Sequence, residues 1–396
     1  MLAAGRPYLA IPGPSVMPDA VLAAMHRAAP NIYEGDLIAM TAGLIPDLRA
    51  VARTAHQAVI YIGNGHAVWE AALANVLSRG DRVLVPATGR FGHGWAEMAR
   101  GLGVEAEVID FGPERTWDTA RIEERLAADR DGRIRAVLAV HVDTASSVRN
   151  DVAGLRAAMD RAGHPALLMA DCIASLGCDR FEMDGWGVDV MVAASQKGLM
   201  VPPGLGFVFF NDRADRARNE ADCVTRYWDW RPRADPQEYW HYFDGTAPTH
   251  HLYGLRVALD MIKAEGIGNV WRRHEVLAQA IWAAFGVWSR GGAVRLNLAD
   301  AGLRSHAVTA AHAGAPDAAR LRAWCEEMAG LTLGIGLGRE PAEAWFRIGH
   351  MGHVNAPMVL GALATIEAGL GALGIAHAPG GVEAAAGVVA RAARPG

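Results

Sequence analysis

The feature that most constrains the fold of this chain is an alternation of short apolar runs with longer amphipathic stretches between residues 58 and 210. The apolar runs are rich in β-branched residues, and the stretches between them have the apolar spacing of helices. Examples of the runs are AVIYI (58–62), RVLVPAT (82–88) and VDVMVAAS (188–195). Strands that are apolar along their whole length are typical of a sheet covered by helices on both faces. The pattern therefore predicts an α/β fold with a mostly parallel sheet.

We expect the chain to divide into three parts. Residues 1–15 form an N-terminal segment, residues 16–255 the large domain, and residues 256–396 a linking helix and a small C-terminal α+β domain. The strand–helix alternation weakens after the long helical stretch 251–288, which motivates the second boundary. Segment 212–245 is rich in Trp, Tyr, Arg and Pro. We expect it to wrap over a surface and to pack between subunits or domains.

Composition excludes several classes of function. The 396 residues carry a formal net charge of -5, and no basic stripe of the kind that nucleic-acid binding requires is present. No sustained apolar stretch of about 20 residues occurs, so we expect neither export nor membrane insertion. The four cysteines form no CxxC pair, and His350 and His353 have no evident third ligand, so we expect neither disulfides nor a metal site. We therefore expect a cytoplasmic protein that binds small solutes.

Lysine is scarce in this chain, because Lys197 and Lys263 are the only lysines among 38 Lys and Arg residues. Lys197 follows the apolar run 188–195 and precedes a glycine. Burial of such a lysine depresses its pKa, so its neutral amine can attack a carbonyl and form a Schiff base. A lysine that merely snorkels at a strand end is commoner, but an arginine could fill that role. We interpret Lys197 as catalytic and Lys263 as a solvated charge near a helix C-terminus.

Other candidate residues follow neighbouring strands, at the edge where parallel sheets bind ligands. Asp171 ends the run 166–170, where a carboxylate is costly unless a cation meets it. A lysine Schiff base combined with an aspartate is what pyridoxal phosphate requires. The turn GNGH (63–66) can hold a phosphate at a helix N-terminus, and Phe91 can stack on a planar ring. Each feature alone has a structural explanation, as a turn cap, a turn or a core aromatic, so the prediction depends on their combination.

Arg347 lies in the segment FRIGHMGH (346–353) of the predicted small domain. A forked guanidinium is the natural partner of a substrate carboxylate, and the alternative is an ion pair at a domain interface. The segment GIGLG (334–338) lacks the full glycine pattern of a dinucleotide-binding loop, so we do not interpret it as one.

The chain resembles the class V aminotransferases, which are fold type I pyridoxal-phosphate enzymes, and in particular their alanine/serine–glyoxylate aminotransferase branch. The resemblance extends over nearly the whole chain. It depends on the segments IPGP (11–14), GNGHAVWEAAL (63–73), GRFGHGW (89–95), HVDTASS (141–147), DCIASLG (171–177), SQKGLMVPPGLG (195–206), TAPTHHLYGL (246–255) and FRIGHMG (346–352).

This resemblance implies a cofactor, pyridoxal 5'-phosphate, and a role for each site residue. Lys197 would bind the cofactor as an aldimine, Asp171 would pair with the ring nitrogen, and Arg347 would bind the substrate α-carboxylate. The ring would lie between Ile173 and Phe91, with Thr144 near its oxygen side. The phosphate would be bound by Gly65, His66, Ala67 and Gln196, and by Thr246 of the other subunit. The resemblance therefore also implies a homodimer with composite active sites.

The implied activity is the transfer of an amino group from serine, alanine or aspartate to a small 2-oxo acid such as glyoxylate. The alternatives are a pyridoxal-phosphate-dependent lyase, a pyridoxamine–pyruvate-type aminotransferase and a non-catalytic cofactor-binding protein. A cysteine desulfurase is disfavoured because Cys325 lies in a predicted helix. The chain departs from the family pattern at Ser147, where Gly is usual, at Ala247, where Pro is common, and in NIYEGD (31–36).

Overall fold

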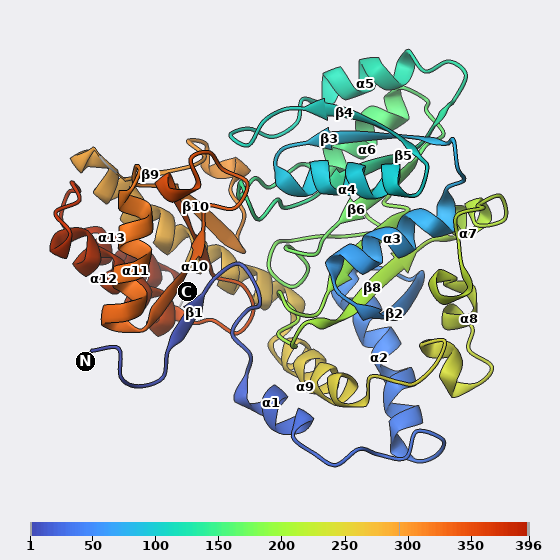
Figure 1. The fold of residues 1–396 in the computed structure, drawn as a ribbon, viewed down its shortest axis with the longest axis horizontal. Helices are drawn as coiled ribbons and strands as arrows, with labels where there is room; N and C mark the ends of the chain where they lie inside the picture. The colour runs from blue at the N-terminus through green and yellow to red at the C-terminus, as the bar shows by residue number, and fades with distance from the viewer. Residues whose placement is uncertain (1, 293, 394–396) are drawn as a thin grey trace.

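The computed structural model describes residues 2–292 and 294–393 and contains two sheets (Figure 1). The larger sheet has seven strands in the order β2-β8-β7-β6-β5-β3-β4. Their bounds are Gln57–Gly63 (β2), Arg82–Ala87 (β3), Glu105–Asp110 (β4), Ile134–Val140 (β5), Leu167–Asp171 (β6), Val190–Ala194 (β7) and Gly204–Phe210 (β8). β8 runs in the opposite direction to the other six strands and is antiparallel to both of its neighbours, β2 and β7. The predicted α/β fold with a mostly parallel sheet is confirmed.

Helices cover both faces of the seven-stranded sheet. Successive side chains of β7 point to opposite faces, so Val192 packs in one apolar cluster and Met191 in the other. The Val192 face is covered by α3 (Gly65–Val76), α4 (Arg90–Gly101) and α7 (Asp212–Ala217). The Met191 face is covered by α2 (Asp36–Ala52), α5 (Thr119–Ala127), α6 (Val152–Arg161) and α9 (Thr249–Glu265), with α1 (Asp19–Met25) packed on α9. This double cover explains why the strands are apolar throughout.

The smaller sheet has five strands in the order β1-β11-β12-β10-β9. They are Tyr8–Ala10 (β1), Leu331–Ile335 (β11), Trp345–Gly349 (β12), Val308–His312 (β10) and Arg295–Leu296 (β9), and only the β1–β11 pair is parallel. Four helices accompany this sheet: α10 (Ile267–Trp288), α11 (Asp317–Ala329), α12 (Ala356–Ala372) and α13 (Gly381–Ala392). Figure 1 shows β1, in dark blue, among the orange elements of the C-terminal third. The N-terminal strand thus completes the C-terminal sheet, while the boundaries at residues 15 and 255 stay predictions.

The aromatic segment 212–245 packs on its own chain. It includes the short helix α8 (Arg231–Ala234). The ring of Trp230 stacks on Phe210 of β8 with centroids 4.0 Å apart. The guanidinium of Arg233, which is 2% exposed, lies 4.5 Å from the ring centroid of Tyr61 on β2. Trp240 remains 43% exposed. Most of the packing in this segment is therefore internal, and the expected packing between subunits stays a prediction.

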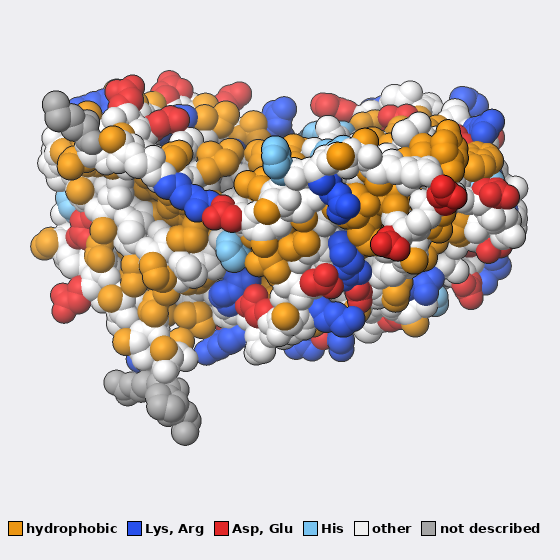
Figure 2. Space-filling model, turned by 90° about the horizontal axis from the view of Figure 1, so that it is seen from below, with side chains coloured by type: hydrophobic (Ala, Val, Ile, Leu, Met, Phe, Trp, Pro, Cys, Tyr) orange, Lys and Arg blue, Asp and Glu red, His pale blue; other side chains and the backbone are white. Residues whose placement is uncertain are grey.

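Charged side chains of both signs are interspersed with hydrophobic ones across the face seen in Figure 2. None of the helices in the described part of the chain is long and apolar enough to cross a membrane.

Candidate active site

A cavity of about 180 Å³ lies at the edge of the seven-stranded sheet where its parallel strands end. Its walls come from the segments that follow β2, β3, β5, β6 and β7. The lining residues are Asn64, Gly65, His66, Trp69, Phe91, Val142, Thr144, Asp171, Ile173, Ala174, Gln196 and Lys197. Eight predicted site residues therefore meet around one space. Three others, Ala67, Thr246 and Arg347, do not line it.

Lys197 follows β7 and extends its side chain toward the N-terminal segment. Its Nζ donates a hydrogen bond to the carbonyl oxygen of Pro12. Burial, together with the nearby positive charge of Arg347, lowers the pKa of this lysine to about 8. Near neutral pH the amine therefore has a neutral fraction that an ordinary lysine lacks.

Asp171 is the last residue of β6 and is buried at the wall of the cavity. Its Oδ1 accepts a hydrogen bond from the backbone N–H of Ile173 at 2.7 Å, and its Oδ2 accepts one from Nε1 of Trp69 at 3.0 Å. Burial nevertheless raises its pKa to about 7. A cation placed in the cavity would stabilise this carboxylate in its charged form.

Trp69 is a site residue that the sequence analysis missed. It lies in α3, one turn after the GNGH turn, and its ring stacks on Trp95 of α4 with centroids 5.8 Å apart. The edge of Trp69 faces the Phe91 ring, with centroids 6.2 Å apart. Trp69 thus joins the aromatic wall of the cavity to Asp171. In the sequence, the only indication of this role was that Trp69 belongs to the segment GNGHAVWEAAL, on which the family resemblance depends.

Asp143 was also missed, although it belongs to the quoted motif HVDTASS. Its Oδ2 accepts a hydrogen bond from the backbone N–H of Phe91 at 2.8 Å, and its Oδ1 accepts from the N–H of Ala145 at 2.8 Å. A Cβ on Gly89 would lie 2.6 Å from that Oδ1. This buried carboxylate therefore joins the N-terminus of α4, which carries Phe91, to the loop that carries Thr144, and burial raises its pKa.

The N-terminus of α3 forms the end of the cavity where the phosphate was predicted. Asn64 caps the helix, and its Oδ1 accepts hydrogen bonds from the N–H groups of His66 at 3.0 Å and Ala67 at 3.3 Å. A Cβ on Gly65 would lie 2.6 Å from Cδ1 of Ile173, so glycine keeps the helix start close to that side chain. Gln196 has a buried Oε1 without a hydrogen-bond partner among the described residues. Either orientation of its amide leaves a polar atom for a ligand.

Arg347 lies on β12, outside the cavity, and is 7% exposed. Its Nε donates to the carbonyl of Ile335 at 2.7 Å, and its Nη1 donates to the carbonyl of Thr144 at 2.9 Å. Burial lowers its pKa to about 10, against the opposing effect of Asp143. The contact with Thr144 fixes the guanidinium beside the loop that lines the cavity.

The structure also shows where the other residues considered in the sequence analysis lie. Thr246 is exposed and does not line the cavity of its own chain. Ser147 has φ = 62°, in the left-handed region that favours glycine, which accounts for the Gly usual at this position. His350 is buried and bonded to Oγ1 of Thr309 at 2.9 Å, as expected of a structural histidine. Cys325 lies buried in α11.

Known proteins are similar to this chain both in sequence and in fold. A sequence model of the aminotransferase class-V family matches residues 46–312. The chain belongs to the class-V aminotransferases. Serine–glyoxylate aminotransferase of Methylorubrum extorquens is 37% identical over 393 residues, covering 96% of this chain and 95% of its own. L-aspartate–glyoxylate aminotransferase of Paracoccus denitrificans is 34% identical, covering 92% of this chain and 91% of its own.

A solved structure extends the similarity to the fold of this class-V aminotransferase. Pyridoxamine–pyruvate aminotransferase of Mesorhizobium loti superposes with a TM-score of 0.89 at 25% identity, covering 98% of each chain. The predicted membership of the family and the predicted fold type I architecture are therefore confirmed. The protein is an aminotransferase, and its family implies pyridoxal phosphate as the cofactor.

Proposed function

We propose that this class-V aminotransferase binds pyridoxal phosphate at Lys197 and transfers the amino group of serine, alanine or aspartate to a small 2-oxo acid, glyoxylate first. The observation that carries the proposal is the pairing of Lys197 and Asp171 in one cavity. Burial lowers the pKa of the first to about 8 and raises that of the second to about 7. Ionisable side chains that line one cavity and have strongly shifted pKa values are typical of catalytic sites. The names of the serine– and aspartate–glyoxylate relatives support the choice of substrates.

The residues of the cavity fit this cofactor. Among the described residues Asp171 forms no ion pair, so a protonated ring nitrogen would meet a buried carboxylate that needs a cation. Phe91 and Ile173 offer apolar surface for the two faces of a ring, with Thr144 beside it. Gly65, His66, Ala67 and Gln196 would hold the phosphate at the start of α3. When bound, the cofactor supplies an electron-withdrawing ring that stabilises negative charge at the substrate α-carbon.

The protein would contribute proton transfer and orientation. The neutral amine of Lys197 takes the proton from the α-carbon of the amino donor and later returns a proton to the α-carbon of the new amino acid. Arg347 binds the α-carboxylate. Because Nε and Nη1 already donate to Ile335 and Thr144, the guanidinium is held in one orientation before the substrate arrives.

The test is the absorption spectrum of the holoenzyme during addition of L-serine, L-alanine or L-aspartate, followed by glyoxylate. We expect at least one donor to convert the bound cofactor to its amino form, and glyoxylate to reverse the conversion while glycine appears. Release of ammonia and pyruvate from serine, or formation of glycine from serine before glyoxylate is added, would replace the proposal by a lyase. Conversion by pyridoxamine and pyruvate alone would assign the pyridoxamine–pyruvate type of reaction.

We also propose a homodimer with composite active sites, in which Thr246 contacts the cofactor phosphate of the partner subunit. The exposure of Thr246 and its absence from the lining of its own chain's cavity support this proposal. The test is co-expression of Lys197→Ala with Thr246→Ala chains that carry different tags. If Thr246 acts across the interface, the hybrid dimer regains one intact site and exceeds both parents in activity. Hybrids no more active than the Thr246→Ala parent would contradict the composite site.

A further inference from the structure

The segment Ile11–Ser15 connects β1 of the five-stranded sheet to the loop that carries Lys197. Oγ of Ser15 donates a hydrogen bond to the carbonyl of Lys197 at 2.7 Å, and the N–H of Ser15 donates to the carbonyl of Gln196 at 2.9 Å. The carbonyl of Pro12 accepts a hydrogen bond from Nζ of Lys197. The segment therefore contacts both the backbone and the amine of this lysine.

Gly13 leaves the space that the lysine side chain occupies. Its φ of +98° lies in the region that favours glycine. A Cβ at this position would also lie 2.7 Å from both Cδ and Cε of Lys197, and closer still to Nζ. Any other residue would therefore displace the lysine side chain.

The opposite side of the segment packs on the strands that hold Arg347. A Cβ on Gly334 of β11 would lie 2.8 Å from Cδ of Pro12 and 3.2 Å from Cβ of Arg347. A Cβ on Gly349 of β12 would collide with the carbonyl of Ile11. The segment is thus held between the five-stranded sheet and Lys197, with little room to shift.

We propose that the segment Ile11–Ser15 is a positioning element for Lys197. The carbonyl of Pro12 holds the amine whenever it is free, and Gly13 provides the room in which the side chain moves between this carbonyl and the cavity. The inference rests on the proposed function, in which the amine is free during part of each cycle. A tethered amine stays oriented for the next proton transfer instead of sampling many rotamers.

The main test compares Gly13→Ala with Gly380→Ala. Gly380 has a φ of +96°, and a Cβ there would meet nothing within 4 Å, so the control has matched backbone strain without the contact to Lys197. In the cofactor-free protein, limited acylation of the amines followed by peptide mass spectrometry compares Lys197 with Lys263 within one sample. We expect the labelling ratio Lys197/Lys263 to rise at least ~3-fold in Gly13→Ala, because the displaced amine enters the cavity, and to stay unchanged in Gly380→Ala.

A second readout separates lysine positioning from cofactor binding. Pyridoxamine phosphate needs no bond to lysine, so its affinity should stay within ~3-fold of wild type in Gly13→Ala, whereas bond formation with added pyridoxal phosphate should slow ~10-fold or more. Wild-type labelling together with a wild-type rate would overturn the inference. If the wild-type protein itself forms no bond with pyridoxal phosphate, the proposed function fails, while the labelling ratio still tests the positioning.

Ser15→Ala provides the test if Gly13→Ala does not fold. This variant removes only the hydrogen bond from Oγ to the Lys197 carbonyl. We expect bond formation with pyridoxal phosphate to slow ~5-fold, which corresponds to the loss of one ordinary hydrogen bond. An unchanged rate together with an unchanged labelling ratio would overturn the positioning role.

Discussion

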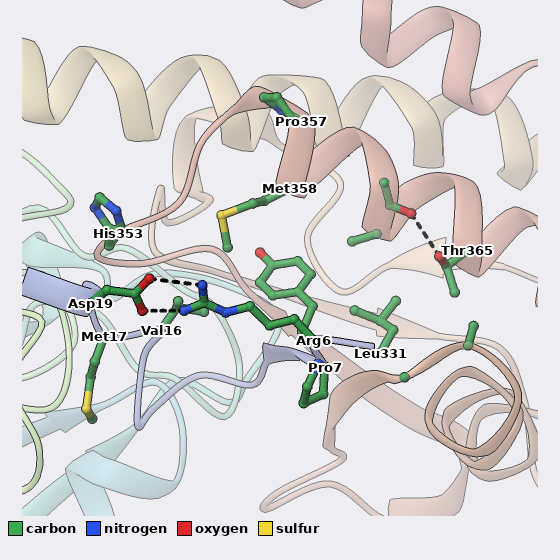
Figure 3. A pocket seen from close by; sticks show the side chains of 15 residues that line it. Arg6, Pro7, Val16, Met17, Asp19, Leu331, His353, Pro357, Met358 and Thr365 are labelled. Atoms are coloured by element: carbon green, nitrogen blue, oxygen red, sulfur yellow. Dashed lines mark hydrogen bonds and ion pairs between the residues drawn. The ribbon is translucent and has the colours of Figure 1, made fainter. Parts of the chain in front are cut away.

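Two cavities of this protein differ in size and in chemistry. The larger, of about 520 Å³, lies between the N-terminal segment and the five-stranded sheet, with Met17, Leu331 and Met358 in its walls (Figure 3). Its charged residues already satisfy each other, since Nη2 of Arg6 lies 2.5 Å from Oδ1 of Asp19 and both side chains are more than 70% exposed. The smaller cavity, of about 180 Å³, holds the buried Asp171, the unpaired Oε1 of Gln196 and the amine of Lys197. Buried ionisable and polar groups that lack a full set of partners therefore identify the reactive site better than the volume of a cavity does.

The difference between the two cavities can be tested by replacing each lysine in turn. Lys197→Ala should lower kcat by ~10⁴-fold or more, because the lining of the cavity contains no second amine that could both bond the cofactor and transfer the proton. Lys263→Ala should keep wild-type kcat, since its exposed amine pairs only with Asp47 on the surface. Steady-state transamination assays measure both values, and substantial activity in Lys197→Ala would contradict the proposed role.

Asp171→Asn should have the second-largest effect. The amide keeps the size of the carboxylate but carries no charge to stabilise a protonated ring nitrogen, so we expect kcat to fall by ~10²–10³-fold. Asp19→Asn in the larger cavity is the matched control and should leave kcat within ~2-fold of wild type. Equal effects of the two substitutions would remove the distinction between the cavities.

Arg347→Ala should raise KM for the amino donor and lower kcat/KM by ~10²-fold, because the α-carboxylate loses its charged partner. Arg6→Ala removes an exposed arginine of the larger cavity and should leave KM within ~2-fold. Initial rates over a range of donor concentrations test both. An unchanged KM in Arg347→Ala would show that the carboxylate is bound elsewhere.

A smaller effect is expected in the pH dependence of Lys197. In the cofactor-free protein its amine should become reactive toward acylation with a midpoint near pH 8, the value to which burial and the charge of Arg347 together lower its pKa. Arg347→Ala removes the second cause of this lowering, so the midpoint should move upward. Peptide mass spectrometry across a pH series measures the midpoint. A downward or absent movement would show that Arg347 does not act on the amine.

Much of the fold and part of the site could be predicted from the sequence. Lys197 and Asp171 follow apolar strands directly, and parallel strands bring their ends to one edge. Trp69 and Asp143 were missed because their contacts depend on distances between a helix, a loop and a strand that no local pattern encodes. The pairing of β1 with β11 was missed for a similar reason, since the three residues of β1 have too little alternation to specify a partner over 300 positions away.

The most direct test of the account is to identify the residue that bonds the cofactor. The holoenzyme is reduced with borohydride and digested, and the peptide that carries the pyridoxyl phosphate group is sequenced by mass spectrometry. The chain has only two lysines, so the result is a choice between them. The account predicts the modification at Lys197, with Lys263 unmodified. A modification at Lys263, or none in a protein that transaminates, would contradict the assignment of the active site.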